Sequence, residues 1–141
     1  MHPQRLIDAN LNRLREGLRV CEDIARFGAD DAVLCRRFKA LRHDIQAAIE
    51  SCRIDTAELI KYRNIDGDVG KKSNNGEKKR SSLFDIFCTN AQRCKESLRV
   101  LEETTKLINR SAPEKFKLIR HKFYSLEKHS VDKLESLRNH R

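Results

Sequence analysis

An internal repeat constrains this chain more than any other feature of its sequence. Residues 10–26, NLNRLREGLRVCEDIAR, return eighty residues later as residues 90–106, NAQRCKESLRVLEETTK. A second shared segment follows, FKALRH at residues 38–43 and FKLIRH at residues 116–121. The residues of the first segment that recur unchanged are Asn10, Arg13, Glu16, Leu18, Arg19, Val20 and Glu22, matched by Asn90, Arg93, Glu96, Leu98, Arg99, Val100 and Glu102. Because such a repeat marks a duplicated structural unit, function should be sought in what the two copies share.

Both copies of the first segment have the hydrophobic spacing of an amphipathic helix. At about 100° per residue, apolar side chains gather on one side of each helix. In the first copy this side carries Leu6, Ile7, Leu11, Leu14, Leu18, Cys21, Ile24 and Ala25, and in the second Leu83, Ile86, Phe87, Cys94, Leu98 and Leu101. The residues expected to face water in the first copy are Arg15, Arg19, Glu22 and Arg26.

Polar residues interrupt the two apolar sides at matched positions. Asn10 falls near the middle of the first apolar side and Arg13 falls at its border. Burying an unsatisfied polar group costs roughly 2–7 kcal/mol, so these side chains need partners. In one interpretation they cap and brace the bundle by bonding to Glu16 or Glu96. In the other, a ligand site lies where the two copies meet, and its candidate catalytic and binding residues are Asn10, Arg13, Glu16, Asn90, Arg93 and Glu96.

The turn and cap signals predict an all-α fold in one domain, residues 1–141. We expect four long helices in a bundle built from a duplicated helix pair, plus one short helix and a long glycine- and lysine-rich loop. The copies span about 4–53 and 81–130. Helices are expected from about residue 4 to 27, from Asp30 or Asp31 onward, over TAELIKY after an Asp55–Glu58 capping box, from Ser81 or Ser82 to about 109, and from Pro113 onward. The tail, SVDKLESLRNHR, is expected to fray.

The loop at residues 63–82 is the segment best supplied with phosphate-binding groups. Its glycines and its cations Arg63, Lys71, Lys72 and Arg80 are what a phosphate cradle needs. Asp66 and Asp68 could hold Mg²⁺ against nucleotide phosphates. The alternative is a solvated basic loop without a ligand. The spacing of glycine and lysine here does not match a Walker A motif.

Net charge and cysteine usage narrow the class of partner. A net charge of +9 favours anionic partners. Nucleic acid is disfavoured because aromatic residues are few and are not interleaved with the basic ones. No apolar run approaches the ~20 residues of a membrane span, and no signal peptide is visible, so we expect no membrane partner and a cytoplasmic protein.

The five cysteines show no CxxC spacing, and we expect buried free thiols at Cys21, Cys52 and Cys94.

Several of these segments resemble one protein family. They are RLIDANLNRLREGLRVCEDIARF, the DGDVG of residues 66–70, the Arg80-Ser81-Ser82 junction and NAQRCKESLRVLEE. They are similar to the all-helical hydroxymethylpyrimidine phosphate kinase family, a small domain often fused to the N-terminus of bacterial thiamine phosphate synthases. The resemblance covers roughly residues 4–127. One departure is Asn64, where the family usually has Asp.

The resemblance implies an enzyme of thiamine biosynthesis. It would phosphorylate 4-amino-5-hydroxymethyl-2-methylpyrimidine phosphate to the diphosphate, with ATP as co-substrate and Mg²⁺ as cofactor, and would not accept the free pyrimidine. A chain of 141 residues leaves no room for the synthase barrel, so it is not expected to join the pyrimidine to the thiazole itself. Thiamine phosphate synthase is a candidate functional partner.

Roles within such a kinase can be assigned as expectations. Arg13, Arg93 and Arg63 would neutralise substrate phosphates. Lys71, Lys72 and Arg80 would close over ATP. Asp66 and Asp68, or the pair Glu16 and Glu96, would hold Mg²⁺. Asn10 and Asn90 would hydrogen-bond the aminopyrimidine or brace the core.

Two other functional classes stay open on the sequence. One is a non-catalytic helical module that binds a phosphorylated thiamine precursor or docks a thiamine phosphate synthase. The other is a basic helical bundle that binds nucleic acid. ATP turnover separates the kinase from the first, and steep salt dependence of DNA or RNA affinity would mark the second. A homodimer through matched helical surfaces is compatible with the sequence.

Overall fold

The computed structural model describes residues 2–72 and 79–139, and every regular element within them is a helix. The all-α prediction is confirmed. The elements are α1 (Pro3–Asp23), continued by the π-helical turn η1 (Ile24–Gly28); α2 (Ala32–Ser51); α3 (Thr56–Ile60); α4 (Leu83–Thr104), continued by the 3₁₀ turn η3 (Thr105–Leu107); and α5 (Ala112–Leu134), continued by η4 (Glu135–Asn139).

The helices α2, α3 and α4 begin where capping side chains accept from their first backbone N–H groups, whereas the N-cap residues of α1 and α5 make no such bond. The Asp31 carboxylate accepts from the Leu34 N–H at 2.9 Å, and the Ser82 hydroxyl accepts from the Asp85 N–H at 3.1 Å. The Asp55 carboxylate accepts from two N–H groups at the start of α3. The second half of that capping box is missing, because the Glu58 carboxylate pairs with Lys61 at 2.7 Å.

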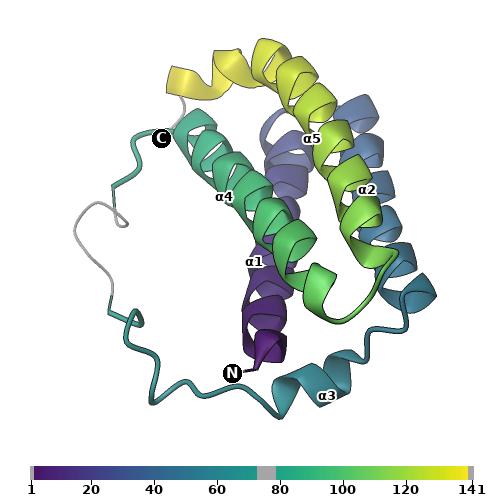
Figure 1. Cartoon of the computed structure of the whole chain (residues 1–141). Helices are drawn as coiled ribbons and strands as arrows, with labels where there is room; N and C mark the ends of the chain where they lie inside the picture. Colours follow the sequence, from purple (N-terminus) through teal and green to yellow (C-terminus); the bar gives the residue numbers. More distant parts are fainter. Residues whose placement is uncertain (1, 73–78, 140–141) are drawn as a thin grey trace.

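The four long helices form a bundle in which α1 and α4 cross at the centre, while α2 and α5 lie side by side (Figure 1). Between α3 and α4, residues 61–72 and 79–82 lie on the outside of the bundle (Figure 1). One continuous core joins the helices. Its largest fully buried side chains include Phe38, Phe87, Phe116, Phe123, Leu14, Leu18 and Leu98.

Three expectations about burial are wrong. Leu6 is 47% exposed because it lies in the open N-terminal turns of α1 and lines a pocket there. Glu22 is only 3% exposed, because it accepts hydrogen bonds from Arg42 of α2. The expected frayed tail is helical to residue 139, and Ser130, Leu134 and Leu137 are buried in it.

The cysteines are free thiols, and Cys21, Cys52 and Cys94 are buried as predicted. The neighbouring Cys94 thiol and burial raise the pKa of Cys21 far above its usual value. Cys21 is therefore a poor nucleophile within the core. Within residues 2–72 and 79–139, no helix combines the length and apolar character that crossing a membrane requires.

Candidate functional site

A pocket of about 420 Å³ lies between α1 and α4, where the two copies of the repeat meet. Arg13 and Arg93, which occupy equivalent positions of the copies, both line it and both are exposed. Its full lining is Asn10, Arg13, Arg93, Glu96, Ser97 and Val100. Four of the six residues proposed from the matched polar positions therefore come together here.

Asn10 and Asn90 are held by their own helices. The Asn10 side chain is nearly buried, and its Nδ2 donates to the Leu6 carbonyl at 2.9 Å. The Asn90 Nδ2 donates to the Ile86 carbonyl at 2.8 Å in the same way. Neither amide bonds to Glu16 or Glu96 within the described residues, so the predicted brace has a different partner. Asn90 is not among the residues that line the shared pocket.

Arg13 and Arg93 form no hydrogen bond or ion pair with any other residue that the structure describes. Each guanidinium offers five N–H donors in a planar fork that matches phosphate oxygens. Two such groups at one pocket could together hold an anion.

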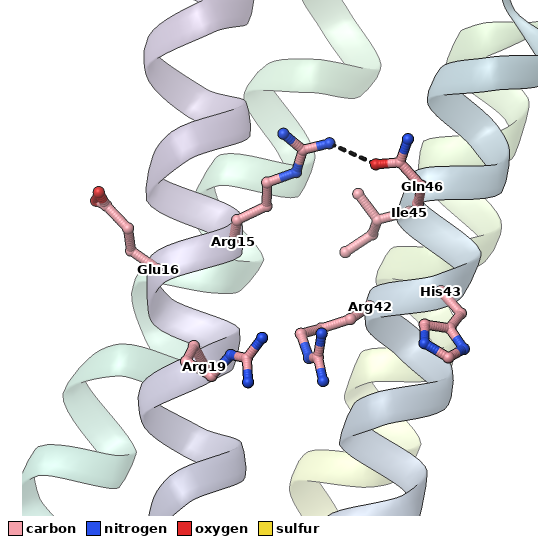
Figure 2. A pocket seen from close by; sticks show the side chains of 7 residues that line it. All are labelled: Arg15, Glu16, Arg19, Arg42, His43, Ile45 and Gln46. Carbon is pink, nitrogen blue, oxygen red and sulfur yellow. Dashed lines mark hydrogen bonds between the residues drawn. The ribbon is translucent and has the colours of Figure 1, made fainter. Parts of the chain in front are cut away.

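Glu16 does not join this pocket. It lines the groove between α1 and α2, and its carboxylate points away from the gap between those helices (Figure 2). Of the predicted pair of glutamates, only Glu96 lies at the pocket that contains the two arginines.

An adjoining pocket of about 560 Å³ connects the site to the loop that follows α3. Its lining residues are His2, Arg5, Leu6, Ala9, Asn10, Arg13 and Asp68. Asn10 and Arg13 belong to both pockets, so the structure brings Asp68 beside the α1–α4 site. Asp66 is exposed two residues away and is not among the lining residues.

Arg63 anchors this loop to α1. Its Nε and Nη2 donate to the two carboxylate oxygens of Asp8, each at 2.8 Å. The Asp8 side chain is only 10% exposed, and the hydrogen bonds from Arg63 hold the pKa of the Asp8 carboxyl below its usual value. Arg63, which was expected to contact a substrate phosphate, thus pairs with Asp8. Asp8 was not among the predicted site residues. Hydrophobic spacing could not reveal this pair, because the two residues are fifty-five positions apart and Arg63 follows α3 in a segment without periodicity.

Asn64 shapes the next turn of the loop. Its side-chain oxygen accepts from the Gly67 N–H at 2.9 Å, and its backbone carbonyl accepts from Arg5 at 3.0 Å. An aspartate could accept both bonds equally well. The departure from the expected Asp therefore keeps the local turn.

The other basic loop residues lie elsewhere. Lys71 and Lys72 are exposed, and neither is among the lining residues of the pockets named here. Arg80 lies at the start of α4, where it lines a separate pocket of about 460 Å³ with Ser81 and Ser82. Residues 73–78 of the predicted functional loop lie outside the described residues.

Oxygen ligands for a cation are few at the site. In the described parts of the chain, no three His, Cys, Asp or Glu side chains gather as a metal site would require. Asp68 Oδ1 accepts from the Gly70 N–H at 2.9 Å, which fixes the carboxylate in its turn. Mg²⁺ commonly uses only one or two carboxylates together with substrate phosphates, so Asp68 fits that donor chemistry.

Two buried ion pairs explain other residues that the copies share. Arg42 of α2 donates through Nε and Nη2 to Glu22 Oε1 at 3.2 and 3.0 Å. At the equivalent place Arg120 of α5 donates through Nε to Glu102 Oε2 at 3.0 Å. Both pairs join the first helix of a copy to the second. The signal was available, because all four residues recur in the two shared segments, yet the position of Glu22 on a single helix predicts a surface residue.

Comparison with known proteins adds one family and several relatives. The sequence model of the ThiD2 family matches residues 5–129. The chain is 40% identical over 125 residues to a thiamine-phosphate synthase of Thermosynechococcus vestitus, covering 88% of this chain and 34% of that protein. It is 37% identical over 124 residues to the protein of the same name from Nostoc punctiforme, covering 87% of this chain and 34% of that protein. To the thiamine-phosphate synthase of Rhodopirellula baltica it is 35% identical over 122 residues, covering 86% of this chain and 32% of that protein.

The chain thus spans about a third of the length of these curated relatives. No solved structure matches it.

Proposed function

The chain belongs to the ThiD2 family, and on that premise we propose that it acts in thiamine biosynthesis as a hydroxymethylpyrimidine phosphate kinase. It would transfer the γ-phosphoryl group of ATP to the phosphate of 4-amino-5-hydroxymethyl-2-methylpyrimidine phosphate. A phosphate oxygen of the substrate attacks the γ-phosphorus, the bond from that phosphorus to the bridging oxygen breaks, and ADP leaves. Support comes from relatives named thiamine-phosphate synthase that contain the same segment.

The observation that carries the proposal is the meeting of Arg13 and Arg93 at one pocket beside Asp68. Phosphoryl transfer between two anions depends on positioning and charge neutralisation more than on covalent catalysis. Arg13 and Arg93 would receive the substrate phosphate through charge-assisted hydrogen bonds. Asn10, at the border of both pockets, would orient the pyrimidine.

Asp68 is the residue we assign to Mg²⁺, with Glu96 as the second carboxylate at the site. When bound, Mg²⁺ neutralises charge on the donor phosphates. Asp68 lies on a loop that Arg63 fastens to α1 through Asp8, and this anchor would hold the carboxylate in place. Arg63 therefore acts as a positioning residue in this proposal.

The deciding experiment is coupled ADP release from the purified chain with Mg-ATP and the pyrimidine monophosphate, with the free pyrimidine as control. We expect turnover on the monophosphate alone. Arg13→Gln and Arg93→Gln should each reduce kcat/KM at least tenfold, as expected for loss of one charged hydrogen-bond donor. Arg110→Gln removes the same charge at an exposed residue that lines neither pocket and should leave kcat/KM within about twofold.

A second candidate is a non-catalytic module that binds the pyrimidine phosphate or docks a thiamine-phosphate synthase. It is favoured by the relatives, in which the matched segment is one third of a longer enzyme. Absence of ADP release from a folded chain that still binds the monophosphate in calorimetry would overturn the kinase proposal in favour of this one.

A further inference from the structure

A second cationic site lies in the groove of about 630 Å³ between α1 and α2. Figure 2 shows Arg15 and Arg19 of α1 and Arg42 of α2 directed into the gap between the helices, whereas Glu16 and His43 point away from it. Ile45 and Gln46 complete the lining.

The three arginines of this groove share a single carboxylate. Glu22, buried beneath them, accepts from Arg42 at 3.0 Å and pairs with Arg19 at 3.4 Å. Arg15 donates instead to the neutral Gln46 Oε1 at 2.8 Å (Figure 2). Gln46 is held in this orientation because its Nε2 donates to Glu50 at 3.0 Å. Most guanidinium N–H groups of the groove are not used by these bonds.

The second copy of the repeat provides an internal comparison. Its cations at the same three positions are Lys95, Arg99 and Arg120. Each pairs with a different carboxylate, in the pairs Lys95–Glu127 at 3.1 Å, Arg99–Glu103 at 3.6 Å and Arg120–Glu102 at 3.0 Å. Glu103 also pairs with Lys106, at 3.1 Å. Three cations therefore face three carboxylates in this copy, against three to one in the first.

Two sequence differences produce this contrast. At the position of Glu127 the first copy has the buried Ile49, so Arg15 loses a carboxylate partner. At the position of Gln46 the second copy has Tyr124, whose hydroxyl accepts from Arg120 at 3.0 Å and whose ring lies 6.0 Å from Lys95 Nζ. Tyr124 thus lies against Lys95 and Arg120 of the second copy, whereas the first copy has the smaller Gln46 at this position.

Asp23 does not supply a second carboxylate for the arginines of the groove. It matches Glu103 in sequence, yet within the described residues it forms no ion pair with Arg19. The formal charges of Arg15, Arg19, Arg42 and Glu22 leave an excess of two positive charges, and the carboxylate of Glu16, which also lines the groove, points away from the gap. Excess cations around an open groove bring an electrostatic cost that a bound anion would remove.

We propose that the α1–α2 groove binds the phosphate group of a small molecule that carries at least two negative charges. Its volume lies in the range of ligand pockets, about 300–1,000 Å³. Arg15 and Arg19 would contact the phosphate oxygens, with Arg42 behind them fixed by Glu22. The site is separate from the Arg13–Arg93 pocket, and its test does not depend on kinase activity.

The test is calorimetric titration of the intact chain at about 0.15 M salt, where long-range surface attraction is screened. Inorganic pyrophosphate is the primary probe, and metal-free ATP and the pyrimidine monophosphate identify which phosphate source binds best. The groove variant combines Arg15→Gln with Arg19→Gln. The matched control combines Lys95→Gln with Arg99→Gln, which removes the same charge from the equivalent positions of the second copy.

We expect the groove variant to weaken pyrophosphate binding at least tenfold and the control to weaken it less than threefold, with both chains folded by circular dichroism. Gln46→Tyr introduces the side chain found at position 124 and should block the groove to a similar extent without changing the net charge. Equal losses in the groove and control variants would overturn the proposal. So would unchanged binding in Gln46→Tyr, binding lost only in Arg13→Gln and Arg93→Gln, or no binding of pyrophosphate up to about 10 mM.

Discussion

Gly17 of α1 lies against Cys94 of α4 so closely that a Cβ atom on residue 17 would stand 2.7 Å from the Cys94 sulfur. The same atom would lie 3.3 Å from the backbone oxygen of Asn90, which cannot rotate away. This contact sets how closely α1 approaches α4. The separation of Arg13 and Arg93 across the pocket depends on it.

Replacing Gly17 by alanine should therefore destabilise the chain although alanine favours helices. Overpacking a core contact costs typically about 1–3 kcal/mol, and the gain in helix propensity offsets about 1 kcal/mol. We expect a net loss of up to about 2 kcal/mol in the free energy of unfolding, measured by urea denaturation.

Two controls accompany this measurement. Adding Cys94→Ala to Gly17→Ala should restore most of the lost stability, because it removes the nearer clashing atom. Ser97→Ala, at the matching position of the second copy, should have a smaller effect. Full stability in Gly17→Ala alone would show that the helices can separate without cost.

The two buried ion pairs should differ in their contribution to stability. Removing one partner of a buried pair leaves an uncompensated charge, at a cost of about 3–5 kcal/mol when burial is deep. The Arg120 side chain is 11% exposed and the Arg42 side chain is 23% exposed. We expect Glu102→Gln to lower the free energy of unfolding by about 3 kcal/mol and Glu22→Gln by about half as much. Urea denaturation of the two variants checks the order, and a larger loss for Glu22→Gln would contradict it.

These pairs also show what helix-by-helix analysis could not detect. The repeat, the helix starts and the apolar sides were predictable, because caps and hydrophobic spacing are local properties of the chain. The position of Glu22 around the axis of α1 predicts an exposed side chain. Glu22 is buried because it pairs with Arg42 of α2, and the residues of one helix alone do not reveal a contact with another helix.

The candidate site was predictable to a similar degree. Matched polar positions indicated that Arg13 and Arg93 would meet, since equivalent residues of a duplicated pair lie together where the copies cross. Glu16 was misplaced because three residues along a helix turn the side chain by about 60° from Arg13, towards the other groove. Arg63 was assigned to the substrate because the glycine-rich loop has no periodicity that would reveal its partner, Asp8.

The Asp8–Arg63 pair makes the attachment of the loop dependent on pH. Because the pKa of Asp8 is lower in the folded chain than its usual value, its contribution to stability is complete above about pH 4. The contribution of Asp8 to stability is lost as the pH falls through the lowered pKa that its carboxyl has in the folded chain. We expect Asp8→Asn to increase proteolytic cleavage of the segment after α3 at pH 7.

The same variant provides the control for the pH effect. The difference in unfolding free energy between the wild type and Asp8→Asn should be largest near neutral pH and shrink below about pH 4. Denaturation across this range measures it. A difference that stayed constant or grew in acid would show that Asp8 does not stabilise the chain through its charge.

The last prediction separates two carboxylates that are two residues apart. Asp68 lines the pocket with Asn10 and Arg13, whereas Asp66 does not. If the chain is a Mg²⁺-dependent kinase, Asp68→Asn should raise the Mg²⁺ concentration needed for half-maximal turnover and reduce kcat about tenfold or more. Asp66→Asn should leave both quantities near their wild-type values. Asparagine keeps the oxygen that accepts from the Gly70 N–H, so the Asp68 variant removes charge without breaking the turn. Equal effects of the two substitutions would mean that the loop attracts the metal only through its total charge, and that Asp68 has no special place at the site.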